Sequence, residues 1–176
     1  VTIGEPATAC MTAPANLQVN VPAENSPMDV QSVNTNASLV GDATYTNMGK
    51  VGRAFEFDGT GDYVRVEDNA AQKPVNQVTA EGWFKFDSLA GLPHLVSKPL
   101  RSSNLNSYAL WYDAGNIRIG YYDTNSSFIF HNTGYSPPLG AWNHYAMVLN
   151  TDDIGPTANT LKLYMNGVEA FSGAAN

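Results

Sequence analysis

The sequence contains one cysteine, few charged residues and no long apolar run, and each shortage excludes a class of protein. Because Cys10 is the only cysteine among 176 residues, neither an internal disulfide nor a thiolate zinc cluster can form within the chain. Cys10 is therefore either an unpaired thiol in a loose N-terminal arm or a link to a partner chain. No apolar run approaches the roughly 20 residues of a membrane-spanning helix, so we expect no membrane insertion.

Basic residues are scarce as well. Lys and Arg number 9 against 16 Asp and Glu, which gives a formal net charge of −7. A nucleic-acid-binding domain needs a basic footprint, so nucleic acid is not an expected partner. Charged residues make up only 14% of the chain and hydrophobic residues 43%, which argues against disorder and allows one buried core.

The chain is instead rich in Asn, Thr, Ser, Gly and Tyr, a composition that suits an exported β-protein. It begins at Val1 rather than Met. We expect it to be the processed form of a protein that is secreted, periplasmic or held at the cell surface.

The segment Gly49–Val66 is the most informative stretch of the chain. Its residues alternate in polarity over Ala54–Phe57 and again over Tyr63–Val66, which is the period of a half-buried strand. Between them, Asp58–Asp62 contains two glycines that can adopt positive φ without steric cost. The pattern predicts a hairpin in which these two strands pair with each other.

Similar alternation recurs along the rest of the chain, and no segment of ten or more residues has clean helical periodicity. The turn residues Asp113–Asn116 and Asn166–Gly167 predict two further hairpins. Many short strands with turns between them predict an all-β fold, an antiparallel two-sheet sandwich of the jelly-roll kind. The further expected strands are a short one within Ala37–Tyr45, then Gln77–Phe86, Leu95–Lys98, Tyr108–Tyr112, Ile117–Tyr122, Ser127–His131, Trp142–Leu149, Thr160–Met165 and Val168–Phe171.

The start of the chain is different in character. Residues 1–22 lack periodicity and carry three prolines, which predicts an N-terminal arm or linker that ends in a short strand at Leu17–Val21. We expect the folded domain to comprise residues 23–176, beginning with a loop rich in Asn, Ser and Pro up to Asn36.

Three phrases in one order carry a family resemblance: Gly49–Val64, Trp142–Ala146 and Leu163–Gly167. Together they resemble the laminin G-like branch of the concanavalin A-like lectin/glucanase jelly rolls, of the bacterial secreted type. The resemblance extends over about Leu17–Phe171. Members of the family normally continue past the Asn-Gly hairpin with further strands, whereas this sequence stops at Asn176. The resemblance therefore implies a jelly roll that is C-terminally incomplete, or one completed by another segment or chain.

Catalysis is not expected. The glycosidases of the same superfamily resemble this chain in fold, but they need two carboxylates at alternate positions of one strand, about 5.5 Å apart for retention. Glu81 and Asp87 are six positions apart, whereas Glu67 and Asp68 are adjacent and would face opposite sides of a strand. His144 has apolar neighbours in register, so we expect a core or structural histidine. The sequence predicts a non-enzyme.

One structural calcium ion is a further expectation. Calcium takes six to eight oxygen ligands, which loops rich in Asp, Asn and Gly can supply, and the resemblance implies that such jelly rolls often hold one ion. Asp29, Asp58 and Asp62 are the candidate ligands. The alternative is that Asp58 and Asp62 only shape their turn through side-chain hydrogen bonds.

A ligand surface is predicted from strand alternation. Trp111, Tyr122, Arg118 and Asn116 could share one accessible face, on which a sugar ring would stack on an aromatic ring beside polar groups. The alternative is that these rings fill the core and ordinary surface. We predict a non-catalytic extracellular recognition or adhesion module that binds glycan or protein. The competing hypothesis is a structural accessory subunit that docks through its sheet edges and N-terminal arm onto a larger complex or filament.

Overall fold

The computed structural model describes residues 16–27, 37–72, 76–99, 106–122, 127–151 and 160–175. The chain divides into two compact units, Val1–Lys73 and Pro74–Asn176. The boundary predicted between residues 22 and 23 falls inside the first unit and stays a prediction, and Cys10 and Asp29 lie outside the described residues. Within the described residues, no helix is long and apolar enough to span a membrane.

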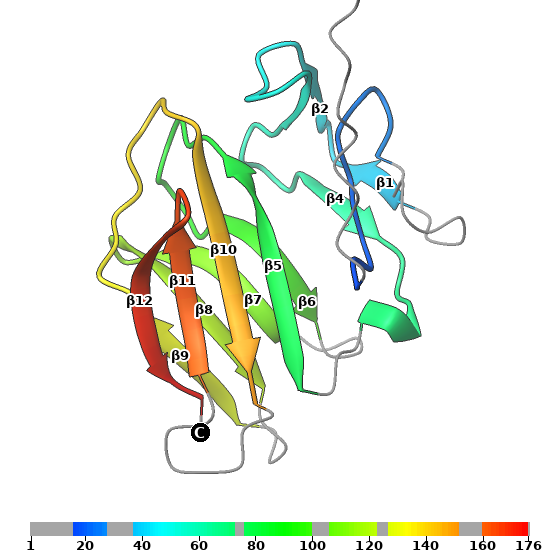
Figure 1. Cartoon of the computed structure of the whole chain (residues 1–176). Coiled ribbons are helices and arrows are strands. Elements are labelled where there is room, and N and C mark those ends of the chain that lie inside the picture. The colour runs from blue at the N-terminus through cyan, green and yellow to red at the C-terminus, as the bar shows by residue number, and fades with distance from the viewer. Residues whose placement is uncertain are drawn as a thin grey trace, which may run out of the picture. The chain divides into compact units, whose positions relative to one another are not determined.

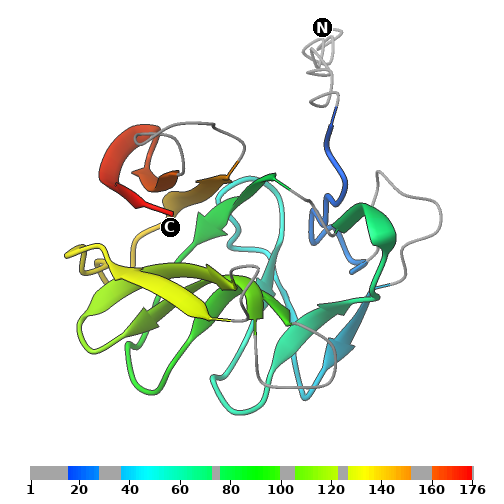
Figure 2. The same cartoon turned by 90° about the horizontal axis from the view of Figure 1, so that it is seen from below.

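The second unit consists of two four-stranded antiparallel sheets, as the alternation predicted. One sheet has the order β12-β11-β10-β5 and the other the order β6-β7-β8-β9. In Figure 1 the first sheet forms the front layer and the second lies behind it, and Figure 2 shows the same two layers from below. The strands are β5 (Gln77–Phe84), β6 (His94–Pro99), β7 (Asn106–Asp113), β8 (Asn116–Tyr122), β9 (Phe128–Asn132), β10 (Asn143–Asn150), β11 (Thr160–Met165) and β12 (Val168–Ala174).

The core of this unit lies between the two sheets, because each strand turns every second side chain inward. From the front sheet, β10 and β11 contribute Tyr145, Met147 and Leu163, and from the back sheet β8 contributes Ile117 and Ile119; all five are 0% exposed. Full burial of one such aliphatic side chain contributes about 1.5–3 kcal/mol. The intervening residues of every strand therefore lie on the two outer faces of the sandwich.

A tight turn joins β11 to β12. Asn166 and Gly167 have φ angles of 49° and 81°, the left-handed pair that a two-residue hairpin turn requires. The Asn166 side chain also reaches β10, where its Oδ1 accepts the His144 N–H at 2.9 Å. Its Nδ2 donates to Asn143 Oδ1 at 2.9 Å. The predicted β11–β12 hairpin is thus confirmed and is tied to the neighbouring strand.

The first unit contains four short strands and one 3₁₀ turn, η1 (Ala70–Gln72). These strands are β1 (Ala37–Val40), β2 (Thr44–Thr46), β3 (Ala54–Glu56) and β4 (Tyr63–Val66). The short strand predicted within Ala37–Tyr45 is confirmed as β1, and β2 is a second strand that extends beyond that range. The strand predicted at Leu17–Val21 is wrong, because these residues lie outside any strand, immediately before Pro22, which lacks a backbone donor for strand pairing.

The predicted pairing of β3 with β4 is also wrong. β1 pairs with β4, with Val40 opposite Tyr63, and β2 pairs with β3, with Thr44 opposite Glu56. The two pairs are the outer and inner halves of one long hairpin. Between them the first strand has three residues, 41–43, and the returning strand has six, 57–62. The turn-forming residues of 58–62 therefore make a loop on the side of a hairpin and not its tip.

Candidate functional site

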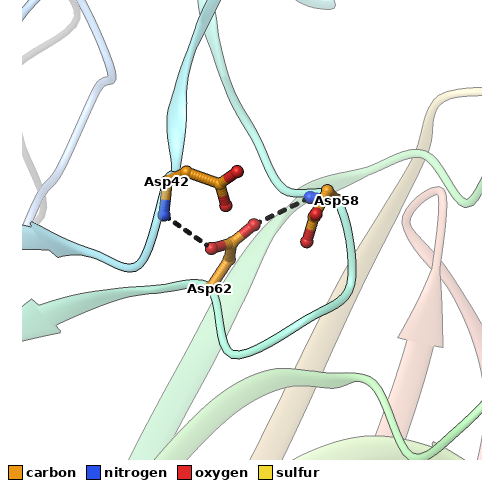
Figure 3. A group of neighbouring side chains, drawn as sticks. All are labelled: Asp42, Asp58 and Asp62. Atoms are coloured by element: carbon orange, nitrogen blue, oxygen red, sulfur yellow. Dashed lines mark hydrogen bonds between the residues drawn. The ribbon is translucent and has the colours of Figure 1, made fainter.

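Asp62 holds the side loop of the long hairpin together. Its Oδ1 accepts the backbone N–H of Asp42 at 3.0 Å, and its Oδ2 accepts the backbone N–H of Asp58 at 2.8 Å (Figure 3). The Asp58 carboxylate in turn accepts the Thr60 N–H at 2.7 Å, as in an Asx turn. A Cβ at Gly41 would lie 2.1 Å from Asp62 Oδ1, so the bridge between the strands requires glycine there.

Three carboxylates meet at this loop. One oxygen from each of Asp42, Asp58 and Asp62 lies within 4.8 Å of the others, with Asp42 and Asp58 exposed and Asp62 half-buried. The backbone N–H of Asp58 lowers the pKa of Asp62, because it hydrogen-bonds to the charged form. The pKa of Asp42 is raised, first by its side-chain hydrogen bond to Asp62 and then by the charges of Asp58 and Asp62. Converging carboxylate oxygens of this kind are the donors that calcium prefers.

Two of the three predicted calcium ligands are thus placed side by side, and a third that the sequence did not single out joins them. Asp42 precedes the 58–62 loop by sixteen residues and reaches it only because β1 pairs with β4. The signal that could have found it is its place directly after Gly41, at the end of a strand. Asp29 lies outside the described residues.

A second candidate site is the outer face of the back sheet, called here the Phe130 face and made up of Trp111, Arg118, Tyr122, Phe128, Phe130 and Asn132. Strand pairing places Trp111 opposite Arg118, and Arg118 opposite Asn132. Tyr122 pairs with Phe128. Three of the four predicted ligand-binding residues therefore lie on one face, as the alternation indicated.

The aromatic rings of this face form one cluster. The Trp111 ring centroid lies 5.7 Å from that of Phe128 and 6.2 Å from that of Phe130, and Tyr122 lies 5.1 Å from Phe128. Trp111 is only 8% exposed, whereas Phe130 is 48% exposed. Trp111 supports the cluster from below, Tyr122 and Phe128 are half-buried, and Phe130 is the most exposed of the four rings.

A glycine gives the rings their position. A Cβ at Gly120 would lie 2.8 Å from the Ile129 carbonyl oxygen, 2.9 Å from Phe130 Cβ and 3.0 Å from Phe128 Cζ. Because such distances are shorter than real Cβ contacts allow, only glycine lets the two phenylalanines lie over β8. Phe128 and Phe130 were not among the predicted ligand-binding residues, although both occupy the same phase of their predicted strand.

Polar groups lie next to the exposed ring. The Arg118 guanidinium forms an ion pair with Asp113, and its Nε donates to Asn132 Oδ1 at 3.2 Å. Its Cζ lies 5.4 Å from the Phe130 ring centroid, within the range of a cation–π contact. Asn116, the fourth predicted residue, donates instead to the Ala114 carbonyl at 3.1 Å in the β7–β8 turn. The face thus combines one open ring with a fixed cation, a carboxylate and an amide.

The histidine expected in the core lies elsewhere. His144 is on the outer face of the front sheet, because Tyr145 and Met147 are the inward residues of β10. Its ring meets Trp83 edge-on at 5.4 Å between centroids, and its Nε2 lies 3.8 Å from a Glu81 oxygen. The interpretation as a core histidine is wrong, since the strand alternates one residue out of phase with that expectation.

Comparisons with known proteins agree with this architecture. The family described as the concanavalin A-like lectin/glucanases superfamily, Laminin_G_3, matches residues 58–176, more than half of the chain. Domain 4 of AbnA, a GH43 extracellular arabinanase from Geobacillus stearothermophilus solved in complex with arabinotriose, is similar with a TM-score of 0.61 and 22% identity. That similarity covers 88% of this chain and 72% of the other.

The binding domain of Paraclostridial Mosquitocidal Protein 1 is similar with a TM-score of 0.58 and 14% identity, over 83% of this chain. This chain spans 37% of the length of that structure. At these identities the likeness concerns the fold. Among curated proteins, none matches the chain.

Proposed function

The chain belongs to the concanavalin A-like lectin/glucanase superfamily, and from this membership and the geometry above we propose that it is a non-catalytic module that binds a glycan on the Phe130 face. The observation that carries the proposal is the half-exposed ring of Phe130 beside the fixed side chains of Arg118, Asp113 and Asn132. A sugar presents an apolar ring face and a rim of hydroxyls. An open aromatic ring next to polar groups matches both.

The face is also prepared for binding before the ligand arrives. Asp113 and Asn132 hold the Arg118 side chain from two directions, so little rotamer freedom is left to lose on binding. The buried Trp111 does the same for Phe128 and Phe130. Asp113 is engaged in an ion pair with Arg118, whereas glycoside hydrolysis needs two carboxylates that flank the scissile bond.

Two structural neighbours support a recognition role. One structural neighbour is described as a binding domain and the other was solved with a bound arabino-oligosaccharide. We extend this to an extracellular or cell-surface setting, where the partner would be a glycan on a surface or a glycan-bearing protein and binding would serve adhesion. Arabinotriose is the first ligand to test, followed by a panel of neutral oligosaccharides.

Calorimetric titration of the full chain tests the proposal. We expect Phe130→Ala to weaken binding of the oligosaccharide at the Phe130 face by at least about tenfold, since one stacking contact is lost. Phe130→Tyr should retain it. Phe57→Ala, which removes another phenylalanine of 47% exposure in the first unit, is the matched control. Undiminished binding by Phe130→Ala would show that the site is elsewhere. Absence of binding to every glycan, with co-purification of a partner chain, would favour the accessory-subunit hypothesis.

We also propose that Asp42, Asp58 and Asp62 bind one structural calcium ion, because their oxygens converge within 4.8 Å. The side loop would supply carbonyl oxygens for the remaining ligands, and the ion would fix the loop against β1. Without an ion, the pKa of Asp42 is raised first by its side-chain hydrogen bond to Asp62 and then by the charges of Asp58 and Asp62, so this cluster disfavours a charged Asp42.

Thermal unfolding of Asp42→Asn separates a calcium site from mere turn formation. In chelator this variant should melt above the wild type, because one like charge is gone. In calcium it should melt below the wild type, because one ligand is gone. A variant that melts above the wild type in both conditions would contradict the calcium site. Asp87→Asn, which changes an aspartate of the second unit with a 78% exposed side chain, is the control.

A further inference from the structure

The front sheet of the second unit carries a surface of its own, called here the Trp83 face and made up of Glu81, Trp83, His144, Ala146, Lys162, Tyr164 and Glu169. Trp83 is one of the large hydrophobic side chains that the protein leaves exposed, at 43%. We propose that this face is a second carbohydrate-binding site, so that one module holds two glycan chains on opposite sides. The proposal extends the glycan-binding function proposed above.

Strand register sets out the face as rows. Trp83 on β5 pairs with His144 on β10. In the next row, Glu81 pairs with Ala146, and Ala146 pairs with Tyr164 on β11. All five are outward residues, because their neighbours along each strand pack in the core.

Ala146 gives the face its shape. It is the one residue between Glu81 and Tyr164 in that row, and its side chain is a single methyl group. Adjacent strands lie about 4.8 Å apart, so the backbones of Glu81 and Tyr164 are separated by roughly 10 Å. Ala146 itself is only 6% exposed, so a sugar ring would stack on the exposed Trp83 and direct its hydroxyls toward Glu81 and Tyr164.

The polar groups around this position act both as donors and as acceptors. The Lys162 Nζ donates to Glu169 Oε2 at 2.8 Å, and the Tyr164 hydroxyl donates to the same oxygen at 3.3 Å. On the other side the Glu81 carboxylate lies 3.8 Å from His144 Nε2. Hydroxyl groups of a sugar need donors and acceptors together, and this rim offers both at short range.

Charge decides which class of ligand fits. Lys162 and Glu169 balance each other, and Glu81 stands beside a histidine, so the face has no strong field of one sign. A phosphate or a basic peptide would find no matching potential. A large apolar protein surface would leave these half-exposed charges buried, which is costly. A neutral glycan is therefore the occupant that the face favours.

The two faces lie on opposite sides of the sandwich, so one short glycan cannot occupy both. The two sheets pack against each other through the core, so their outer faces point in opposite directions. Packed sheets lie about 10 Å apart, and side chains on each outer face add to that separation. A trisaccharide cannot reach both sites. Two sites would therefore bridge separate chains or separate stretches of one polysaccharide, with a gain in avidity on multivalent ligands.

Stoichiometry measured with arabinotriose, or with the best trisaccharide of the panel, tests the second site. The wild type should bind two molecules. Trp83→Ala and Phe130→Ala should each bind one, and the double variant none, with an affinity loss of at least about tenfold at each altered site. Val168→Ala is the matched control, since it shortens another exposed apolar residue (69%) of the front sheet. Trp83→Phe, which keeps a ring, should retain part of the binding.

The outcomes separate the two proposals. One bound trisaccharide, lost in Phe130→Ala and unaffected by Trp83→Ala, overturns the second site and leaves the proposed function standing. The reverse result moves the proposed function to the Trp83 face. No binding to any glycan overturns both. As a second readout, the wild type should cross-link and precipitate a soluble arabinan, and either single variant should bind the polymer without precipitating it.

Discussion

Each outer face of the sandwich carries a tryptophan, which is buried on one face and exposed on the other. On the Phe130 face, a cluster of four aromatic rings surrounds one arginine, and the largest ring, Trp111, is buried. On the Trp83 face the tryptophan is exposed, the central Ala146 is buried, and charged pairs lie around it. An aromatic residue on an outer face can therefore either pack beneath other rings or be exposed for contact with a ligand. Its neighbours on adjacent strands decide which.

The largest expected effect is on the two tryptophans. Trp111→Ala should lower the free energy of unfolding by about 3–5 kcal/mol, because it removes a ring packed against Phe128, Phe130 and His94. Trp83→Ala should cost less than Trp111→Ala, because 43% of that residue is already in water. Urea unfolding measures both. Equal losses would mean that the two faces do not differ in the way described.

Next in size is the glycine beneath the phenylalanines. Gly120→Ala should destabilise the protein by about 1–3 kcal/mol, because the new methyl group overlaps the Ile129 carbonyl and the Phe130 side chain. It should also weaken glycan binding on the Phe130 face and leave the Trp83 face unchanged. Thr79→Ala, at an outward and exposed position of β5, serves as the control. A Gly120→Ala protein with wild-type stability would show that the rings can move at little cost.

Smaller effects on stability are expected at the loop that carries Asp58 and Asp62. This site lies on a loop, whereas the two faces lie on strands. Because the pKa of Asp62 is lowered on folding, its carboxylate stabilises the protein above the usual aspartate pKa of 3.8. This contribution is lost as the pH falls through the lowered value. Asp62→Asn in chelator should therefore melt below the wild type near pH 7, with the gap closing in acid.

The opposite sign holds for Asp42. Its pKa is raised on folding, so its ionisation opposes folding as the pH rises, and calcium binding should weaken as the pH falls into the raised range. Melting curves and calcium titrations between pH 3 and pH 7 measure both effects. A gap between Asp62→Asn and wild type that stays constant over this range would contradict the assignment.

The smallest effect is expected in the core that separates the two faces. Tyr145 is 0% exposed, and its hydroxyl has no hydrogen-bond partner among the described residues. Burial raises the pKa of this phenol, with a further contribution from Tyr135. Tyr145→Phe should keep the packing and remove an unsatisfied polar group, so stability should stay the same or rise by about 1 kcal/mol. Glycan binding on both faces should not change, and a loss of binding would indicate that the core adjusts the faces.

The strands of the sandwich could be predicted from sequence because the information is local. The alternation of polar and apolar residues that predicts a strand lies within that strand's own sequence. Asn166–Gly167 is likewise a dipeptide typical of a two-residue hairpin turn. The partner of a strand is not local. The residues of 58–62 have the chemistry of a hairpin tip, yet β3 pairs backward with β2, which no residue inside the loop reveals.

The candidate sites could likewise be predicted only as far as the pattern of a single strand shows them. Alternation placed Trp111, Arg118 and Tyr122 on one face, but it could not show that Phe128 and Phe130 would cover the tryptophan from a third strand. Asp42 was missed for the related reason that its approach to Asp58 and Asp62 depends on the β1–β4 pairing. Exposure and convergence are properties of several strands together, and a single-strand pattern does not contain them.

The hydrogen bonds of Asp62 determine where the hairpin can accept inserted residues. It binds the backbones of Asp42 and Asp58, and so it closes the 58–62 loop at its base. The pairings on either side, Val40 with Tyr63 and Thr44 with Glu56, are then fixed independently of what lies between 58 and 62. Doubling the length of such a loop costs only about 0.6 kcal/mol in closure entropy. This is therefore the place where the hairpin can accept inserted residues without a shift in register of either half.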